Sequence, residues 1–344
     1  MSAKRETKSF PRRSRRSSIR TSTSSSPNNT TDRPILLFGP TGCGKTDVLS
    51  LLARTGRDLS LEVISADSRQ VYRGFDIGTA KPSEGERTIV PHHLIDICDG
   101  DESYDIGRFV AACDELVPAI SGRGGTAVLS GGTAFYLQGY LYGLPGTPHA
   151  SPEVRRALEE RILRDGLTAL RRELAEVDPV TEARIAANDA YRVVRALEVY
   201  YTSRRPLSSY SVPTVVRDHL DPLIIGIFRE RDELYRRINE RVRRMFAAGL
   251  AEEVATLLSR GYGADSPAFA GIGYREFLEI GGTPPWSAQE LDAIQERIAR
   301  NTRRYAKRQE TFFRKIPRVR WIHAEDAGGI ATEVTRWVAA VRRG

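Results

Sequence analysis

A phosphate-binding signature between residues 35 and 46 constrains the fold of this chain more than any other feature. The apolar run Ile35–Phe38 leads directly into Gly39-Pro40-Thr41-Gly42-Cys43-Gly44-Lys45-Thr46, a full match to G-x-x-x-x-G-K-[ST]. A short apolar run is typical of a buried strand, and glycines let the next loop turn its N–H groups inward. The signature predicts a di- or triphosphate site, with Lys45 on the outer phosphates and Thr46 as the ligand of Mg²⁺.

Strand-like and helical segments alternate along the rest of the chain. Strands are expected over 61–65, 91–97, 126–129 and 223–228, and helices after Thr46 and over 104–120, 232–259 and 291–313. This order predicts an α/β fold, a P-loop NTPase-like parallel sheet flanked by helices. Ligands of such sheets bind beyond the carboxyl ends of the strands, so Asp67 and Thr133 are expected beside the phosphate loop. Asp67 could also be a simple helix cap.

Composition divides the chain into four segments. Residues 1–33 hold nine Lys or Arg and two acids, whereas the other 311 residues hold 43 and 42. We expect this Ser/Arg-rich stretch to be a disordered tail, with a transit peptide or an RNA-binding tail as alternatives. The breaker cluster at 144–149 predicts a core over 34–145, a helical insertion domain over 146–220, and a second part of the core over 221–344.

Several classes of protein are disfavoured by composition. No apolar run approaches the ~20 residues of a membrane-spanning helix, so we expect no membrane contact. The three cysteines lack C-x-x-C spacing, and the five histidines lack the spacing of a metal site. This pattern suits a reducing compartment, and we expect a cytoplasmic monomer.

A cationic stripe marks the long helix near the C-terminus. It consists of Arg300, Arg303, Arg304, Lys307 and Arg308, spaced to share one helical face. Residues 299–320 hold nine basic residues and one acid, Glu310. Such a stripe is often only a solvated face, but the lack of neighbouring acids favours a polyanion site here.

Seven sequence blocks together resemble the tRNA dimethylallyltransferases, also called tRNA isopentenyltransferases, of the IPP transferase family. They are GPTGCGKT (39–46), ISADSRQVYRGFDIGTAKP (64–82), PHHLIDI (91–97), GGTAFYLQGYLYG (131–143), DPVTEARIAANDAYRVVRALEVY (178–200), AGIGYRE (270–276) and YAKRQETFFRK (305–315). The resemblance extends from residue 34 to about residue 322. It implies transfer of the dimethylallyl group from dimethylallyl diphosphate to the N6 amine of adenosine 37, beside the anticodon of tRNA.

The same resemblance implies roles for individual residues. Asp67 becomes the general base, Thr133 contacts the reacting region, and Arg241 faces the diphosphate, which Gly39–Thr46 bind with Mg²⁺. The implied contacts with the tRNA anticodon stem-loop are Asp67, Ser68, Arg69, Gln70, Arg155, Arg192, Arg195, Gly271, Gly273, Tyr274, Arg275, Lys307, Arg308, Gln309 and Arg314.

Other functions remain open at this stage. Adenylate isopentenyltransferases act on a free nucleotide, and a P-loop kinase for a small molecule shares the loop and the aspartate after the second strand. A nucleotide-dependent RNA-binding switch would use the loop as a gate. If Asp67 instead binds Mg²⁺ like a Walker B aspartate, Asp96 is the next candidate base because it too lies in a predicted strand.

Overall fold

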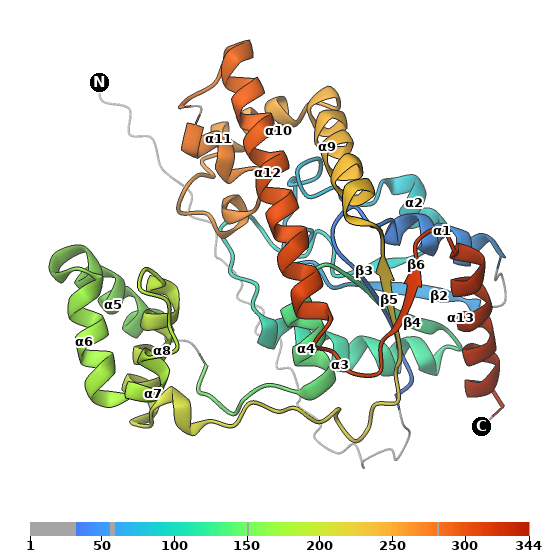
Figure 1. Cartoon of the computed structure of the whole chain (residues 1–344), viewed down its shortest axis with the longest axis horizontal. Helices are drawn as coiled ribbons and strands as arrows, with labels where there is room; N and C mark the ends of the chain where they lie inside the picture. Colours follow the sequence, from blue (N-terminus) through green and yellow to red (C-terminus); the bar gives the residue numbers. More distant parts are fainter. Residues whose placement is uncertain (1–31, 56–58, 150, 281, 344) are drawn as a thin grey trace, which may run out of the picture. The chain divides into compact units, whose positions relative to one another are not determined.

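The computed structural model of the chain describes residues 32–55, 59–149, 151–280 and 282–343 (Figure 1). The tail predicted over 1–33 lies almost wholly outside these ranges, so its disorder stays a prediction. None of the described helices combines the length and the apolar composition needed to cross a bilayer.

Six parallel strands form one sheet in the order β3-β2-β4-β1-β5-β6. They are β1 (Ile35–Phe38), β2 (Leu61–Ser65), β3 (His92–His93), β4 (Thr126–Gly131), β5 (Leu223–Phe228) and β6 (Arg320–His323). The predicted parallel α/β fold is confirmed. The strand expected over 91–97 was predicted too long, because Leu94 and Asp96 have positive φ angles of 61° and 57° and leave the ladder. Strand β6 was not predicted, since its residues follow a basic stretch without a clear apolar run.

Apolar side chains of β1 alternate between the two faces of the sheet, as a fully buried central strand requires. Ile35 and Leu37 pack with α1 (Lys45–Thr55), α9 (Arg231–Ala247) and α13 (Ala327–Val341). Leu36 and Phe38 pack on the other face with α3 (Ile106–Gly122) and α4 (Ala134–Tyr142). These two helical layers bury the sheet and leave the carboxyl ends of its strands as the place for a ligand (Figure 1).

The C-terminal half contains two helices where the periodicity predicted one. The helix expected over 232–259 is divided into α9 and α10 (Leu250–Ser259), because Gly249 adopts a left-handed φ of 96°. The predicted helix over 291–313 is confirmed as α12 (Ala288–Phe313), which begins at a capping box formed by Ser287 and Glu290. It packs along α9 and α11 (Arg275–Ile280).

The segment between β4 and β5 is helical, as expected. It contains α5 (Pro152–Asp165), α6 (Leu167–Val177), α7 (Pro179–Glu182) and α8 (Ala190–Ser203). These helices have an apolar cluster of their own, which includes Leu158, Leu170, Leu174, Val193 and Leu197. A tRNA-binding role for this segment stays a prediction. Further short elements are α2 (Glu84–Ile89) and the 3-10 turns η2 (Leu207–Ser209) and η3 (Pro267–Ala270).

Candidate functional site

The loop between β1 and α1 has glycines where its backbone conformation and its close contacts require them. Gly42 and Gly44 have φ angles of +83° and +104°, which favour glycine. A Cβ on Gly39 would collide with the carbonyl oxygen of Ile227 on the neighbouring strand. Within the described ranges, no acceptor faces the N–H groups of Gly42, Gly44, Lys45 and Thr46. A cluster of open donors at a helix N-terminus favours an anion such as a diphosphate.

Two arginines bind carbonyl groups of this loop. The Arg229 Nε donates to the carbonyl oxygen of Cys43 at 2.8 Å, and the Arg237 Nε donates to that of Gly42 at 3.0 Å. These two hydrogen bonds hold the backbone of the loop in place. The sequence gives no sign that either arginine binds the loop, because both lie far along the chain from it and belong to no local motif.

Asp67 follows β2 and shapes its own turn. Its Oδ1 accepts hydrogen bonds from the N–H groups of Arg69 at 2.8 Å and Gln70 at 3.4 Å. No partner is found for its Oδ2 among the residues that the structure describes. The carboxylate is therefore a turn cap on one side and an open acceptor on the other, which suits a base held in a fixed orientation.

Thr133, at the exit of β4, is tied to the same turn. Its Oγ1 accepts from the Ser68 N–H at 3.0 Å, and its own N–H donates to the carbonyl of Ala66 at 3.0 Å. Burial raises the pKa of the nearby Tyr305 to about 12, and the negative charge of Asp67 adds to this effect. The structure thus brings Asp67 and Thr133 together, but the Thr133 hydroxyl is already engaged by Ser68.

A cavity of about 1050 Å³ joins the phosphate loop to Asp67 and to Arg241 on α9. Burial lowers the pKa of Arg241, and the charge of Asp67 acts in the opposite direction. An arginine keeps its proton under such conditions. Across the described part of the chain Arg241 has no hydrogen-bond or ion-pair partner, so its charge is available to an anion in the cavity.

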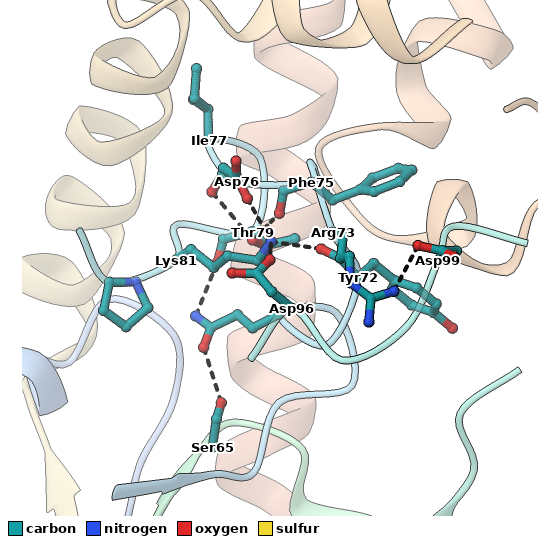
Figure 2. A network of polar contacts seen from close by, with 12 residues as sticks. Ser65, Tyr72, Arg73, Phe75, Asp76, Ile77, Thr79, Lys81, Asp96 and Asp99 are labelled. Carbon is teal, nitrogen blue, oxygen red and sulfur yellow. Dashed lines mark hydrogen bonds and ion pairs between the residues drawn. The ribbon is translucent and has the colours of Figure 1, made fainter. Parts of the chain in front are cut away.

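A second polar network supports the turn that carries Asp67 (Figure 2). The Lys81 Nζ, whose side chain is 2% exposed, donates to Asp76 and Asp96 at 2.5 Å each and to the carbonyl of Tyr72 at 2.6 Å. Gln70 accepts from the Ser65 hydroxyl at 3.0 Å and is also tied to the segment before Lys81. These contacts fix the chain on both sides of the turn.

Asp96, the alternative candidate for the general base, is poorly suited to accept a proton. Its two oxygens accept from Lys81 at 2.5 Å and from Arg87 at 2.8 Å. Burial alone would raise the pKa of Asp96, but these hydrogen bonds outweigh it and hold the pKa below its ordinary value. A carboxylate with two cationic partners is a weak proton acceptor.

We expect Asp96→Asn to lower the free energy of unfolding by about 1–2 kcal/mol at pH 7, because buried Lys81 loses a charged partner. The folded-state pKa of Asp96 is depressed, so its contribution is present above the ordinary value near pH 4 and disappears as the pH falls through the folded-state pKa. Urea unfolding should therefore show a larger effect of Asp96→Asn at pH 7 than at pH 3. Asp99→Asn, in an exposed pair with Arg73, is the control and should change little at either pH. An equal effect of Asp96→Asn at both pH values would contradict the assignment.

The segment over 270–276 docks onto the loop around residue 78. Gly273 has a φ of +106°, and a Cβ there would lie 3.0 Å from the Gly78 carbonyl oxygen. Tyr274 is 1% exposed, and its hydroxyl donates at 2.7 Å to Glu253, which also accepts from the Ile77 N–H at 2.8 Å. The Tyr274 side chain is thus turned inward and acts in packing, which the sequence pattern did not predict. Arg275 remains partly exposed beside two glutamates, Glu276 and Glu279.

Arginines of the helical segment gather around one buried carboxylate. Glu198, which is 0% exposed, pairs with Arg155 at 3.2 Å and with Arg195 at 2.8 Å. Arg155 also lies over the ring of Tyr191, which is 67% exposed. Arg192 is separate and pairs with the helix cap Asp189. The structure therefore brings Arg155 and Arg195 together, through a glutamate that the sequence analysis did not single out.

The cationic stripe on α12 is largely free of acidic partners. Arg303 donates to Asn239 at 2.5 Å and belongs to the contact between α9 and α12. The exposed members are Arg300, Arg304, Lys307 and Arg308, followed by Arg314 beyond the helix. No acid of the described chain pairs with any of these five residues. Their charge favours a polyanion.

Comparison with known proteins decides the family. The family model described as IPP transferase matches residues 70–316 of this chain. The chain belongs to the IPP transferase family. The tRNA dimethylallyltransferase of Geobacter sulfurreducens is 44% identical over 290 residues, which cover 84% of this chain and 91% of that protein. The enzyme of the same name from Syntrophobacter fumaroxidans is 42% identical and covers 89% of this chain and 88% of its own length.

A solved structure agrees with this assignment. The full-length tRNA isopentenylpyrophosphate transferase from Bacillus halodurans superposes with a TM-score of 0.63 and 35% sequence identity, covering 91% of this chain and 98% of that one. The fold expected from the family resemblance is thereby confirmed for almost the whole chain.

Proposed function

We propose that the protein transfers the dimethylallyl group from dimethylallyl diphosphate to the N6 amine of adenosine 37 in tRNA, releasing diphosphate. Similar proteins are named as tRNA dimethylallyltransferases. The observation that carries the proposal is the single cavity shared by the phosphate loop, the unpaired Arg241 and the open oxygen of Asp67. This cavity therefore combines an anion site for the diphosphate of the prenyl donor with a proton acceptor for the amine of the acceptor. We also propose that the enzyme acts as a monomer in the cytoplasm.

The residues that bind the prenyl donor would stabilise its leaving group, the diphosphate. The loop N–H groups, Lys45 and Arg241 would bind the diphosphate and the charge that develops on it, and such stabilisation commonly contributes more to catalysis than any other effect. No group of three His, Cys, Asp or Glu side chains in the described residues could hold a metal. The hydroxyl of Thr46 nevertheless fits Mg²⁺, which commonly takes one protein oxygen together with substrate phosphates and water. Bound there, Mg²⁺ would neutralise part of the diphosphate charge.

The acceptor side would use Asp67. The N6 lone pair forms a bond to the first carbon of the prenyl group, while the bond from that carbon to oxygen breaks and leaves its electrons on the diphosphate. The Oδ2 of Asp67 takes the proton that N6 loses. Because an adenine stacked in the anticodon loop cannot reach a cavity, the base must leave the stack first.

A free nucleotide as acceptor is the second candidate. Adenylate isopentenyltransferases share the chemistry but do not need a surface for a polyanion. The unpaired cations on α12 favour a macromolecular acceptor over AMP.

Radiolabelled dimethylallyl diphosphate, offered with bulk tRNA, AMP or no acceptor, tests the proposal. We expect label in tRNA alone, and no label in transcripts whose adenosine 37 is replaced by guanosine. Label in AMP but not in tRNA would establish the alternative, and label in neither acceptor would contradict prenyl transfer.

The cationic stripe should contribute to the affinity for tRNA and not to the rate of prenyl transfer. We expect Arg304→Gln, Lys307→Gln and Arg314→Gln together to weaken binding and to reduce the slope of log affinity against log salt by about 0.7–0.9 per lost phosphate contact. The rate at saturating tRNA should change little. Filter binding at several salt concentrations measures this, with Arg243→Gln, an exposed residue paired with Glu240, as the control. An unchanged affinity and slope would identify the stripe as a solvated face.

A further inference from the structure

The side-chain amide of Gln309 lies between the two halves of the candidate site. Its Oε1 accepts a hydrogen bond from the N–H of Thr41, in the phosphate loop, at 2.8 Å. Its Nε2 donates to the carbonyl oxygen of Gly132, directly before Thr133, at 2.7 Å. One amide thus joins the loop that would bind the diphosphate to the turn that carries Thr133.

The orientation of this amide is fixed by its partners. The N–H of Thr41 can only donate, and the carbonyl of Gly132 can only accept, so the oxygen and nitrogen of Gln309 cannot exchange places without losing both bonds. Gly132 leaves room for the contact, since a Cβ there would collide with the Gln309 Nε2. Tyr305, one turn earlier on α12, donates to the same carbonyl at 3.3 Å.

Gln309 also differs from its neighbours on α12 in the direction it faces. It is 3% exposed and belongs to the same buried side of the helix as Ala306 and Phe313. Lys307 and Arg308 lie on the exposed side. The family resemblance assigned all three polar residues to tRNA contact, but the burial separates the amide from the cations.

We propose that Gln309 is a positioning residue that sets the phosphate loop and the Gly132–Thr133 turn relative to each other, and not an RNA contact. This rests on the proposed function, because it assumes that the loop binds the diphosphate of the prenyl donor. Both hydrogen bonds of the amide are made to backbone groups of the protein. It acts by holding the Thr41 backbone, so that the next N–H groups of the loop meet the leaving group while Thr133 and Ser68 hold the Asp67 turn.

Gln309→Met tests the proposal because it keeps the length of the side chain and removes both hydrogen bonds. We expect a rise of roughly 10- to 100-fold in the KM for dimethylallyl diphosphate, since the Thr41 N–H loses its acceptor and the Gly132 carbonyl loses one of its donors. The kcat should fall by a similar factor through misplacement of the reactants. The Kd for tRNA, from filter binding, should stay within about twofold of the unmodified enzyme.

Gln309→Glu separates the two contacts. Ionised glutamate can still accept from the Thr41 N–H but places a carboxylate against the Gly132 carbonyl. Its KM for the prenyl donor should lie closer to that of the unmodified enzyme than the KM of Gln309→Met, while its kcat remains low. Equal KM values in the two variants would refute the separate roles of the two bonds.

Two further variants serve as controls. Asn301→Leu removes another half-buried polar contact of α12, its 2.7 Å bond to Glu276, and should lower the melting temperature without changing the KM for the donor. Lys307→Ala should weaken tRNA binding alone. If Gln309→Met weakens tRNA binding and spares the donor KM, the residue is an RNA contact. If only the melting temperature of Gln309→Met falls, as in Asn301→Leu, the amide is a packing residue.

A binding measurement keeps this test independent of the proposed activity. Calorimetry with inorganic pyrophosphate and Mg²⁺ reports on the loop without tRNA or turnover, and Gln309→Met should bind this probe roughly 10-fold more weakly. Prenyl transfer to tRNA by the unmodified enzyme tests the proposed function separately. Unmodified enzyme that transfers no prenyl group but binds pyrophosphate in a Gln309-dependent manner would overturn the function and retain the positioning role. Undiminished pyrophosphate binding by Gln309→Met would overturn the positioning role.

Discussion

Asp67→Asn should lower kcat by roughly 10²–10⁴-fold while the affinity for dimethylallyl diphosphate changes little. Asparagine keeps an oxygen for the Arg69 and Gln70 N–H groups, so the turn should survive. It replaces the open Oδ2 with an amide nitrogen that cannot accept a proton. Single-turnover prenylation of tRNA at saturating donor measures the rate of the chemical step.

A metal-binding role for Asp67 predicts a different result. If Asp67 binds Mg²⁺ in the manner of a Walker B aspartate, Asp67→Asn should weaken Mg²⁺ and diphosphate binding and leave the rate at saturation nearly intact. The control is Asp96→Asn, which removes a carboxylate already occupied by Lys81 and Arg87 and should reduce kcat by less than about 10-fold. A larger loss in Asp96→Asn than in Asp67→Asn would place the base at Asp96 after all.

The parts of this site that could be predicted from the sequence are those encoded locally. The phosphate loop is contiguous, and its glycines and Lys45 lie within a few residues of each other. Asp67 and Thr133 could be placed beside it because the carboxyl ends of parallel strands meet at one edge of a sheet. That reasoning needs only the parallel polarity of the strands, which the alternation of helices and strands predicts.

The contacts that hold the site were less accessible, because each joins segments distant in sequence. Arg229, which follows β5, and Arg237, on α9, bind carbonyls of the loop after β1, and no local motif marks either arginine. Gln309 occurs within a recognisable block, yet its partners, Thr41 and Gly132, are fixed only by the packing of α12. A family motif assigns importance to such a residue without giving the direction of its side chain.

Hydrophobic periodicity also failed to predict the ends of helices and strands that are set by the backbone conformation of a single residue. The apolar pattern continues across Gly249, so one helix was predicted where the left-handed residue makes two. Similarly, positive φ angles at Leu94 and Asp96 end β3 after two residues and turn Asp96 toward Lys81. That turn, invisible to periodicity, is what removes Asp96 from the candidate bases.

Arg241→Gln should reduce kcat/KM by roughly 10²–10³-fold, the effect of removing one donor from a site of developing negative charge. Arg241 lies one helical turn beyond Arg237 on α9. Arg237 donates a hydrogen bond to the carbonyl of Gly42 in the loop, whereas Arg241 is left to bind the diphosphate. The loss should appear in kcat as well as in the KM for the donor, because charge on the diphosphate increases as the carbon–oxygen bond breaks.

Two matched variants sharpen this prediction. Arg241→Lys keeps the charge as a single point and should recover part of the activity, whereas Arg243→Gln, on the exposed side of the same helix and paired with Glu240, should have no effect. Steady-state kinetics with dimethylallyl diphosphate and saturating tRNA measure all three. Should Arg241→Gln raise the KM for tRNA and leave the donor kinetics unchanged, the unpaired guanidinium would serve the acceptor phosphates. In that case the loop and Lys45 would bind the diphosphate without Arg241, and the kcat of Arg241→Gln should stay close to that of the unmodified enzyme.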